Sequence, residues 1–151
     1  MNEVNMKIKR ISEKFSDIEL PNYATEGSAG MDIRAAIDDE VVIKAGEIKL
    51  IPTNIILEIP VGYEIQVRPR SGLALKHGIT LLNAPGTIDS DYRGEVGIIM
   101  SNFSKNDFTI NRGDRIAQLV LSKYYTAVLE ETSEVAESKR GEGGFGHTGK
   151  N

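Results

Sequence analysis

The chain has 151 residues, of which 40% are hydrophobic and 26% charged, and this suits one compact domain that buries roughly 70% of its unfolded surface. The formal net charge of −4 and the pI near 5.3 argue against a general nucleic-acid or membrane-surface binder, because such proteins carry a basic stripe or a basic amphipathic helix. The sequence contains no cysteine, so disulfides and thiolate metal sites are excluded.

The first residues are polar, and no run approaches the roughly 20 apolar residues of a membrane span. We therefore expect a cytoplasmic protein, or one that acts inside a host cell if it is viral. We expect neither a membrane partner nor stable nucleic-acid binding.

Short runs in which apolar and polar residues alternate recur along the chain, and this period predicts strands. Turn-forming groups rich in Gly and Pro separate the runs at the spacing of a sandwich or barrel, so we expect an all-β fold. The runs are Met6/Ile8, Ile48/Leu50, Ile55/Leu57/Ile59, Tyr63/Ile65/Val67, Val96/Ile98/Met100, Phe108/Ile110 and Ile116 to Leu121.

Asp32 follows a glycine in Ala29-Gly30-Met31-Asp32, where it is interpreted as a turn residue. Further along, the run Leu73 to His77, stopped by Gly78, is the one segment with a helical pattern, about one and a half turns long. Ser71 is the expected N-cap of this helix.

A capped helix start leaves free backbone N–H groups beside Arg70, which together would bind an anion. Alternatively, Ser71 only caps the helix while Arg68 and Arg70 face solvent. Capping alone does not call for two arginines, and the two interpretations have about equal weight.

Asp89-Ser90-Asp91 follows Pro85-Gly86. If the chain is extended here, both carboxylates lie on one face and suit metal binding or water activation. The alternative is a solvated turn in which one aspartate bonds its own backbone.

Two polar features interrupt the last apolar runs of the domain. Gln118 lies within an apolar strand and needs a hydrogen-bond partner if it is buried. Arg112-Gly113-Asp114 is interpreted as a hairpin turn between two strands.

The two histidines, His77 and His147, do not predict a zinc site. They are far apart in sequence and lack the other ligands that a zinc site needs.

The composition changes after Tyr125, and the residues from Glu137 onward hold five glycines, no aliphatic residue and one aromatic, Phe145. Such a segment cannot bury itself, so it is either a disordered end or a flap that orders over a ligand. Its glycines would let N–H groups approach phosphates, Arg140 would add a bidentate charge and Phe145 could stack on a base. We divide the chain into a β domain, residues 1–135, and a flexible tail, residues 136–151, that closes over the site.

These segments together resemble, in order, the five motifs of the homotrimeric dUTPase family, and the match spans about residues 25–149. The matching strings are Ala29-Gly30-Met31-Asp32, Pro69-Arg70-Ser71-Gly72, Asn83 to Tyr92, Gly113 to Leu119 and Arg140 to Gly149. The resemblance implies a jelly-roll-like (β-clip) domain, a homotrimer with active sites shared between subunits, and hydrolysis of dUTP to dUMP and pyrophosphate with Mg²⁺.

The resemblance also assigns residues. Asp89 would be the catalytic base that activates water, and Asp32 would help to hold Mg²⁺ through water, the ion being bound mainly by the triphosphate. Tyr92 would pack on the deoxyribose and exclude a 2′-hydroxyl. The implied substrate-binding residues are Arg70, Ser71 and Gln118 at the α- and β-phosphates, Asn83 with backbone groups at the uracil, Tyr92 at the sugar, Phe145 on the uracil ring, and Arg140 with the glycine-rich backbone, His147 included, over the γ-phosphate. Gly72, Gly86, Gly146 and Thr148 are also implied to bind the substrate.

One position departs from the family pattern: His147 stands where serine is more frequent, and it could weaken the γ-phosphate contact or make it pH-dependent. The alternative functions are a dCTP deaminase or bifunctional deaminase and dUTPase, and a non-catalytic regulatory module on the same fold. Tyr92 directly after Asp91 favours the hydrolase, and intact Asp89 and Arg140 argue against a decayed site.

Overall fold

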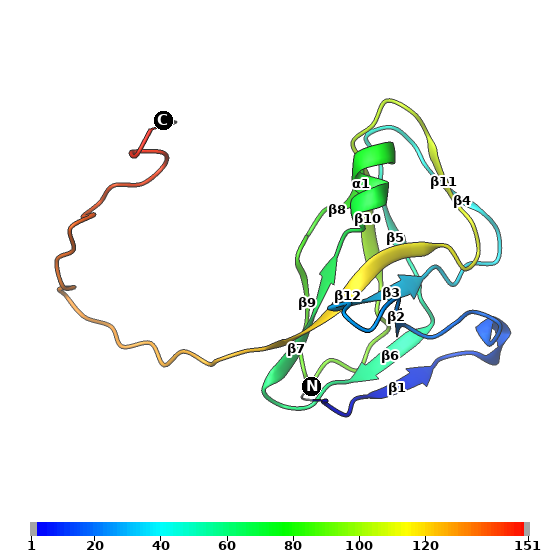
Figure 1. Cartoon of the computed structure of the whole chain (residues 1–151), viewed down its shortest axis with the longest axis horizontal. Coiled ribbons are helices and arrows are strands. Elements are labelled where there is room, and N and C mark those ends of the chain that lie inside the picture. The colour runs from blue at the N-terminus through cyan, green and yellow to red at the C-terminus, as the bar shows by residue number, and fades with distance from the viewer. Residues whose placement is uncertain (1–2, 150–151) are drawn as a thin grey trace.

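The structure is a computed structural model that describes residues 3–149. It consists of short strands, one α-helix and one 3₁₀ turn, followed by a long C-terminal segment (Figure 1). The elements are β1 (Lys7–Arg10), η1 (Glu13–Phe15), β2 (Asn22–Tyr23), β3 (Gly30–Arg34), β4 (Val41–Ile43), β5 (Ile48–Ile51), β6 (Ile55–Glu58), β7 (Tyr63–Arg68), α1 (Ser71–His77), β8 (Ile79–Leu81), β9 (Gly86–Ile88), β10 (Ile98–Asn102), β11 (Phe108–Ile110) and β12 (Arg115–Lys123).

The strands pair antiparallel in four sheets. The largest has the order β2-β3-β12-β7-β9, a second has the order β5-β10-β8, and two pairs are β1-β6 and β11-β4. Consecutive neighbours in these sheets are mostly distant in sequence, as in a jelly roll. The prediction of an all-β, jelly-roll-like domain with one short helix is therefore confirmed.

The core lies between these sheets and is built from the inward residues of the alternating runs. Ile65 and Val67 of β7, Ile98 and Met100 of β10 and Leu119 of β12 are all buried. Burying each such side chain contributes about 1.5 to 3 kcal/mol relative to leaving it exposed. The alternation thus predicted the strands, and in β6, β7 and β10 its apolar residues are the buried ones, whereas Ile48 and Leu50 of β5 are exposed.

Five strands were not predicted: β2, β3, β4, β8 and β9. Length is not the reason, because the predicted β11 has only three residues, but in β3 the polar Asp32 interrupts the apolar pattern. The most consequential is β3, because it contains Asp32 with 6% of its surface exposed. The interpretation of Asp32 as a turn residue was therefore wrong.

The predicted helix is present, but it begins two residues earlier, at Ser71. The N-cap is Arg70, whose side chain makes no capping bond, so the assignment of Ser71 as N-cap was wrong. The end was predicted correctly, since Gly78 adopts φ 63° and its N–H reaches the carbonyls of Leu73 and Ala74.

Arg112-Gly113-Asp114 does form a turn, in which Gly113 has φ 80° and the Asp114 carboxylate accepts from the N–H of Asn111 at 2.7 Å. It is not a hairpin turn, however. β11 pairs with β4, whereas β12 pairs with β3 and β7. The turn instead carries the chain from one sheet to another.

The C-terminal segment leaves the domain after β12 and extends away from it (Figure 1). The N–H of Tyr124 still bonds the carbonyl of Gly62 at 3.1 Å. From residue 125 to 149, the described hydrogen bonds join residues of this segment to one another. Lys150 and Asn151, which complete the predicted tail, lie outside the described residues, and the division at residue 135 stays a prediction.

In the described part of the chain, no helix is long and apolar enough to cross a membrane.

Candidate functional site

Asp32 lies between two guanidinium groups. Its Oδ1 accepts from Nε of Arg70 at 3.1 Å, and its Oδ2 accepts from Nη1 of Arg115 at 3.0 Å. A carboxylate as buried as this one is stable only when it is paired and hydrogen-bonded. Arg70 also donates from Nη1 to the carbonyl of Arg115 at 3.3 Å, so the three residues form one connected group.

The sheet explains why these residues meet. β12 has β3 on one side and β7 on the other, and the register places Gln118 opposite both Asp32 and Arg68. Arg70 follows β7 by two residues and can therefore reach back across β12. Arg115 was not predicted as a site residue, because its contact with Asp32 depends on the pairing of β12 with β3, which is visible only in the structure.

The predicted phosphate residues surround this group. Ser71 and Gly72 are exposed in the first turn of α1, and a Cβ added at Gly72 would meet nothing within 4 Å. Gln118 is half-buried and packs over Gly30, where an added Cβ would lie 3.3 Å from the Cβ of Gln118. Gly30 thus leaves room for the glutamine beside Asp32. Because Gln118 is only half-buried, water can satisfy its amide.

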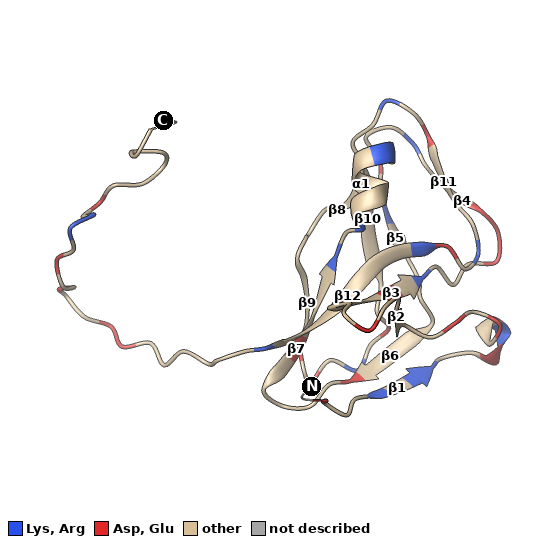
Figure 2. Ribbon diagram, in the orientation of Figure 1, with Lys and Arg blue, Asp and Glu red and all other residues tan. Residues whose placement is uncertain are grey.

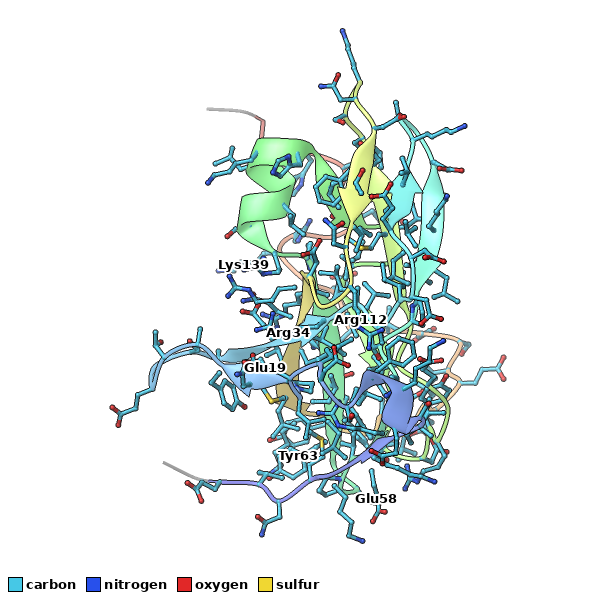
Figure 3. The ribbon with its side chains drawn as sticks, turned by 90° about the vertical axis from the view of Figure 1, so that its right-hand side faces the viewer. Glu19, Arg34, Glu58, Tyr63, Arg112 and Lys139 are labelled. Atoms are coloured by element: carbon cyan, nitrogen blue, oxygen red, sulfur yellow. The ribbon has the colours of Figure 1, made fainter. Side chains whose placement is uncertain are left out.

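Hydrogen bonds from Arg34 and Ala35 hold the backbone that leads into Arg115. Arg34 of β3 donates to the carbonyl of Gly113 at 3.0 Å and to Glu19 at 2.6 Å, and Figure 3 shows Arg34 beside Glu19. The N–H of Ala35 bonds the carbonyl of Asp114 at 2.9 Å. The backbone directly before Arg115 is therefore fixed to the strand that contains Asp32.

A second group surrounds Asp89. β9 ends at Ile88, and the N–H of Tyr92 then bonds the carbonyl of Asp89 at 3.2 Å, which closes a turn. The extended conformation that would place Asp89 and Asp91 on one strand face is therefore wrong. Asp89 instead lines a cleft of about 190 Å³ with Thr87, Ile88, Tyr92, Glu95, Val96 and Gly97.

Asn83, which is predicted to contact uracil, lies in the connection from β8 to β9, and Gly86 is the first residue of β9. The connection includes a cis peptide bond between Ala84 and Pro85. A Cβ added at Gly86 would lie 3.2 Å from Nδ2 of Asn83 and 3.3 Å from Cβ of Val67. Glycine at position 86 therefore allows the Asn83 amide to lie close to the backbone of β9.

The two groups lie at opposite ends of β7. Antiparallel pairing of β9 with β7 places Ile88 opposite Ile65, so Asp89 lies near the beginning of β7, whereas Arg70 lies beyond its end. Asp32 is level with Arg68. Asp89 and Asp32 are separated by about 13 Å measured along the strands. Measured across the sheet, they are separated by three strand spacings of roughly 4.8 Å each.

The tail residues join neither group. Nε of Arg140 donates to the carbonyl of Gly143 at 2.7 Å, and the ring of His147 lies against Gly143, where an added Cβ would be 2.6 Å from Cδ2. The Phe145 side chain is fully exposed. Gly146 and Thr148 lie in turns of the same segment.

Charged residues are spread over the domain, with basic ones at the end of α1 and at the start of β12 (Figure 2). Within residues 3–149, no three acidic or histidine side chains gather closely enough to hold a metal ion.

Outside the site, Arg112 forms an ion pair with Asp17. The hydrogen bond from Arg112 lowers the pKa of the Asp17 carboxyl, and the same hydrogen bond raises the pKa of Arg112.

The chain matches the family model for dUTPase over residues 16–149. It is 56% identical over 149 residues to the deoxyuridine 5′-triphosphate nucleotidohydrolase of Rickettsia akari, with 99% of both chains covered. The protein of the same name from Syntrophotalea carbinolica is also 56% identical, again with 99% of both chains covered.

Solved dUTPase structures have the same fold. The Staphylococcus bacteriophage 80alpha dUTPase with dUpNHpp superposes with a TM-score of 0.85 at 28% identity, covering 96% of this chain and 98% of that one. A mutant dUTPase from phage phi11 of S. aureus, in which a structural Mg(II) ion is coordinated, has a TM-score of 0.78 at 26% identity, covering 89% of this chain and 100% of that one. Sequence, motif order and fold agree, and the chain belongs to the dUTPase family.

Proposed function

We propose that this protein hydrolyses dUTP to dUMP and pyrophosphate. The observation that carries the proposal is the pairing of Arg70 and Arg115 on the buried Asp32, which holds a cationic group in place beside the start of α1. The relatives at 56% identity are named for this activity. In a cell the reaction would limit uracil in DNA and supply dUMP for thymidylate synthesis.

The phosphates would bind at the start of α1. Hydrolysis of a triphosphate depends mainly on positioning and on neutralising charge, which arginines and backbone N–H groups provide. Arg70 would contact the α- and β-phosphates with Gln118 and the backbone of Ser71 and Gly72. Arg140 and the N–H groups of the tail would enclose the γ-phosphate.

Chemistry and base recognition would come from the second group. Asp89 would accept a proton from the water that attacks the α-phosphorus, and Tyr92 would lie along the deoxyribose. Asn83 and the backbone near Gly86 would hydrogen-bond uracil, and Phe145 would stack on it. Cytosine would present a donor amino group to donors of the pocket, leaving buried groups unpaired.

We propose a homotrimer in which each site combines these groups from different subunits. The proposal is supported by the separation of Asp89 from Asp32, which holds the Arg70 guanidinium: about 13 Å along the strands and three strand spacings across the sheet, more than one α-phosphate spans. Contiguous exposed apolar patches mark interaction surfaces, whereas single exposed apolar residues are ordinary. Exposed apolar residues that a subunit contact would cover lie on the β5-β10-β8 sheet and just after it, and in the C-terminal segment: Ile48, Leu50, Leu82, Val128, Leu129 and Val135.

We also propose Mg²⁺ as the cofactor, bound mainly by the triphosphate. Both Asp32 oxygens already accept hydrogen bonds from arginines, but each keeps a second lone pair and could accept from a metal-bound water. This donor set fits an indirect role. The ion would neutralise charge on the phosphates. Since the nucleotide pool lies inside the cell, we place the enzyme in the cytoplasm.

The direct test is release of pyrophosphate and ammonia from dUTP, dCTP, dTTP and UTP, each with Mg²⁺. We expect pyrophosphate from dUTP, little from the others and no ammonia. The 5-methyl group should exclude thymine. Ammonia from dCTP would favour the deaminase, and binding of dUTP without turnover would favour the regulatory module.

A further inference from the structure

We propose that Gly94 and Glu95 fix the position of the Tyr92 ring and thereby determine the discrimination between deoxyribose and ribose, an inference that rests on the proposed function. Both lie in the loop between β9 and β10, and Glu95 lines the same cleft as Asp89 and Tyr92.

Gly94 provides the space that the Tyr92 ring occupies. A Cβ added at Gly94 would lie 2.5 Å from Cζ of Tyr92 and 2.9 Å from Cε2, and it would overlap the hydroxyl oxygen. Real Cβ atoms do not approach other heavy atoms so closely. Gly94 is not among the described glycines with positive φ, so the requirement here is for space and not for an unusual backbone conformation.

Glu95 provides the anchor. Its backbone carbonyl accepts the Tyr92 hydroxyl at 2.9 Å. The Glu95 side chain is anchored in turn, because its Oε1 accepts from the N–H groups of Thr53 at 3.2 Å and Asn54 at 2.7 Å. Both donors belong to buried residues, and a buried N–H left unpaired would be costly.

The next residue reinforces this anchor. The N–H of Val96 bonds the carbonyl of Ile55 at 2.8 Å, and the Thr53 hydroxyl donates to the carbonyl of Val96. Asn54 has φ 62° and uses its side chain to bond both backbone groups of Ser12. The carbonyl that receives the Tyr92 hydroxyl is therefore fixed to a buried corner between β5 and β6.

A Tyr92 ring held in this way suits steric exclusion of a ribose 2′-hydroxyl. Tyr92 keeps 46% of its surface exposed while its hydroxyl is bonded and Gly94 lies against its ring. A ring that could swing aside would yield to an added 2′-hydroxyl, whereas a fixed ring rejects it. Discrimination by one such contact is typically about 10- to 200-fold.

The main test replaces Gly94→Ala and compares kcat/KM for dUTP and UTP. The methyl group should displace the ring and lower the dUTP to UTP ratio by about tenfold or more. Gly27→Ala is the matched control, because an added Cβ there meets nothing within 4 Å; its ratio should equal that of the wild type. Thermal midpoints of both variants would confirm that they are folded.

Two further comparisons separate positioning from general damage. Glu95→Gln keeps an acceptor oxygen for Thr53 and Asn54 and should keep the ratio, whereas Glu95→Ala should lower it. Gly94→Ala added to Tyr92→Ala should lower the ratio no further, because both act through one ring.

The inference is overturned if folded Gly94→Ala keeps the wild-type ratio, or if its effect persists without the Tyr92 ring. In either case a wild-type enzyme selective for dUTP would leave the proposed function intact. A wild-type protein without dUTP turnover would overturn both.

Discussion

Nε of Arg70 lies 3.1 Å from Oδ1 of Asp32, although 38 residues separate them in the chain. Arg70 is at the N-cap of α1 and Asp32 is inside β3, so the contact joins the helix to the central sheet. Arg115 bonds the other oxygen of Asp32. The orientation of Arg70 therefore depends on a carboxylate that it shares with a second arginine.

We expect Arg115→Gln to weaken both the fold and the substrate site. Asp32 would keep one guanidinium partner of two, and because the Arg115 side chain is 45% exposed, we expect a loss of about 1 to 2 kcal/mol in the free energy of unfolding, less than for a fully buried pair. KM for dUTP should rise as Arg70 loses its orientation. Urea unfolding and steady-state kinetics measure both effects. Lys76→Gln, which removes an exposed charge from α1, is the control, and an equal effect in both variants would contradict a specific role for Arg115.

Asp89→Asn should separate binding from chemistry. The amide preserves shape but cannot accept a proton, so we expect kcat to fall by roughly 100-fold or more while affinity for dUTP is retained. Affinity can be measured by calorimetry with the non-hydrolysable dUpNHpp. Asp91→Asn, in the same turn, is the matched control. Normal turnover by the Asp89 variant would leave Asp89 as a turn residue only.

Acid should selectively remove the contribution of the ion pair between Asp17 and Arg112. The hydrogen bond from Arg112 lowers the pKa of Asp17 below its usual 3.8. A lowered folded-state pKa means that this stability is fully present above that usual value and is lost as the pH falls through the folded-state pKa. Asp17→Asn should therefore lower the thermal midpoint slightly at neutral pH and have no effect in stronger acid. The exposed Asp39→Asn provides the comparison, and a pH-independent difference would rule out the ion pair as its cause.

The sequence predicted the fold class and the helix end because those depend on local signals, namely period-two alternation and a glycine stop. It did not predict the burial of Asp32, since this polar residue within β3 disrupts the apolar pattern. The role of Arg115 depends on β3 and β12 being neighbours, which no local pattern encodes. The separation of Asp89 from Arg70 likewise follows from the register of β9 on β7, and it became visible only in three dimensions.

The tail should act on a site of another subunit, because in one chain it extends away from the domain and Phe145 is fully exposed. Deleting the residues from Glu137 onward should leave a folded but inactive trimer, since the deleted segment contributes nothing to the buried core.

Mixed trimers test the sharing of sites. If Asp89 and the tail of one site come from different chains, Asp89→Asn subunits and tail-deleted subunits should complement each other, although each is inactive alone. In randomly assembled, equal mixtures about a quarter of the sites would be intact, because each donor is correct in about half of the cases. The two variants would be refolded together from denaturant, confirmed as trimers by light scattering and assayed for dUTP turnover per site. Recovery near that fraction supports shared sites, whereas no recovery in confirmed mixed trimers would mean that Asp89 and the tail act within one chain.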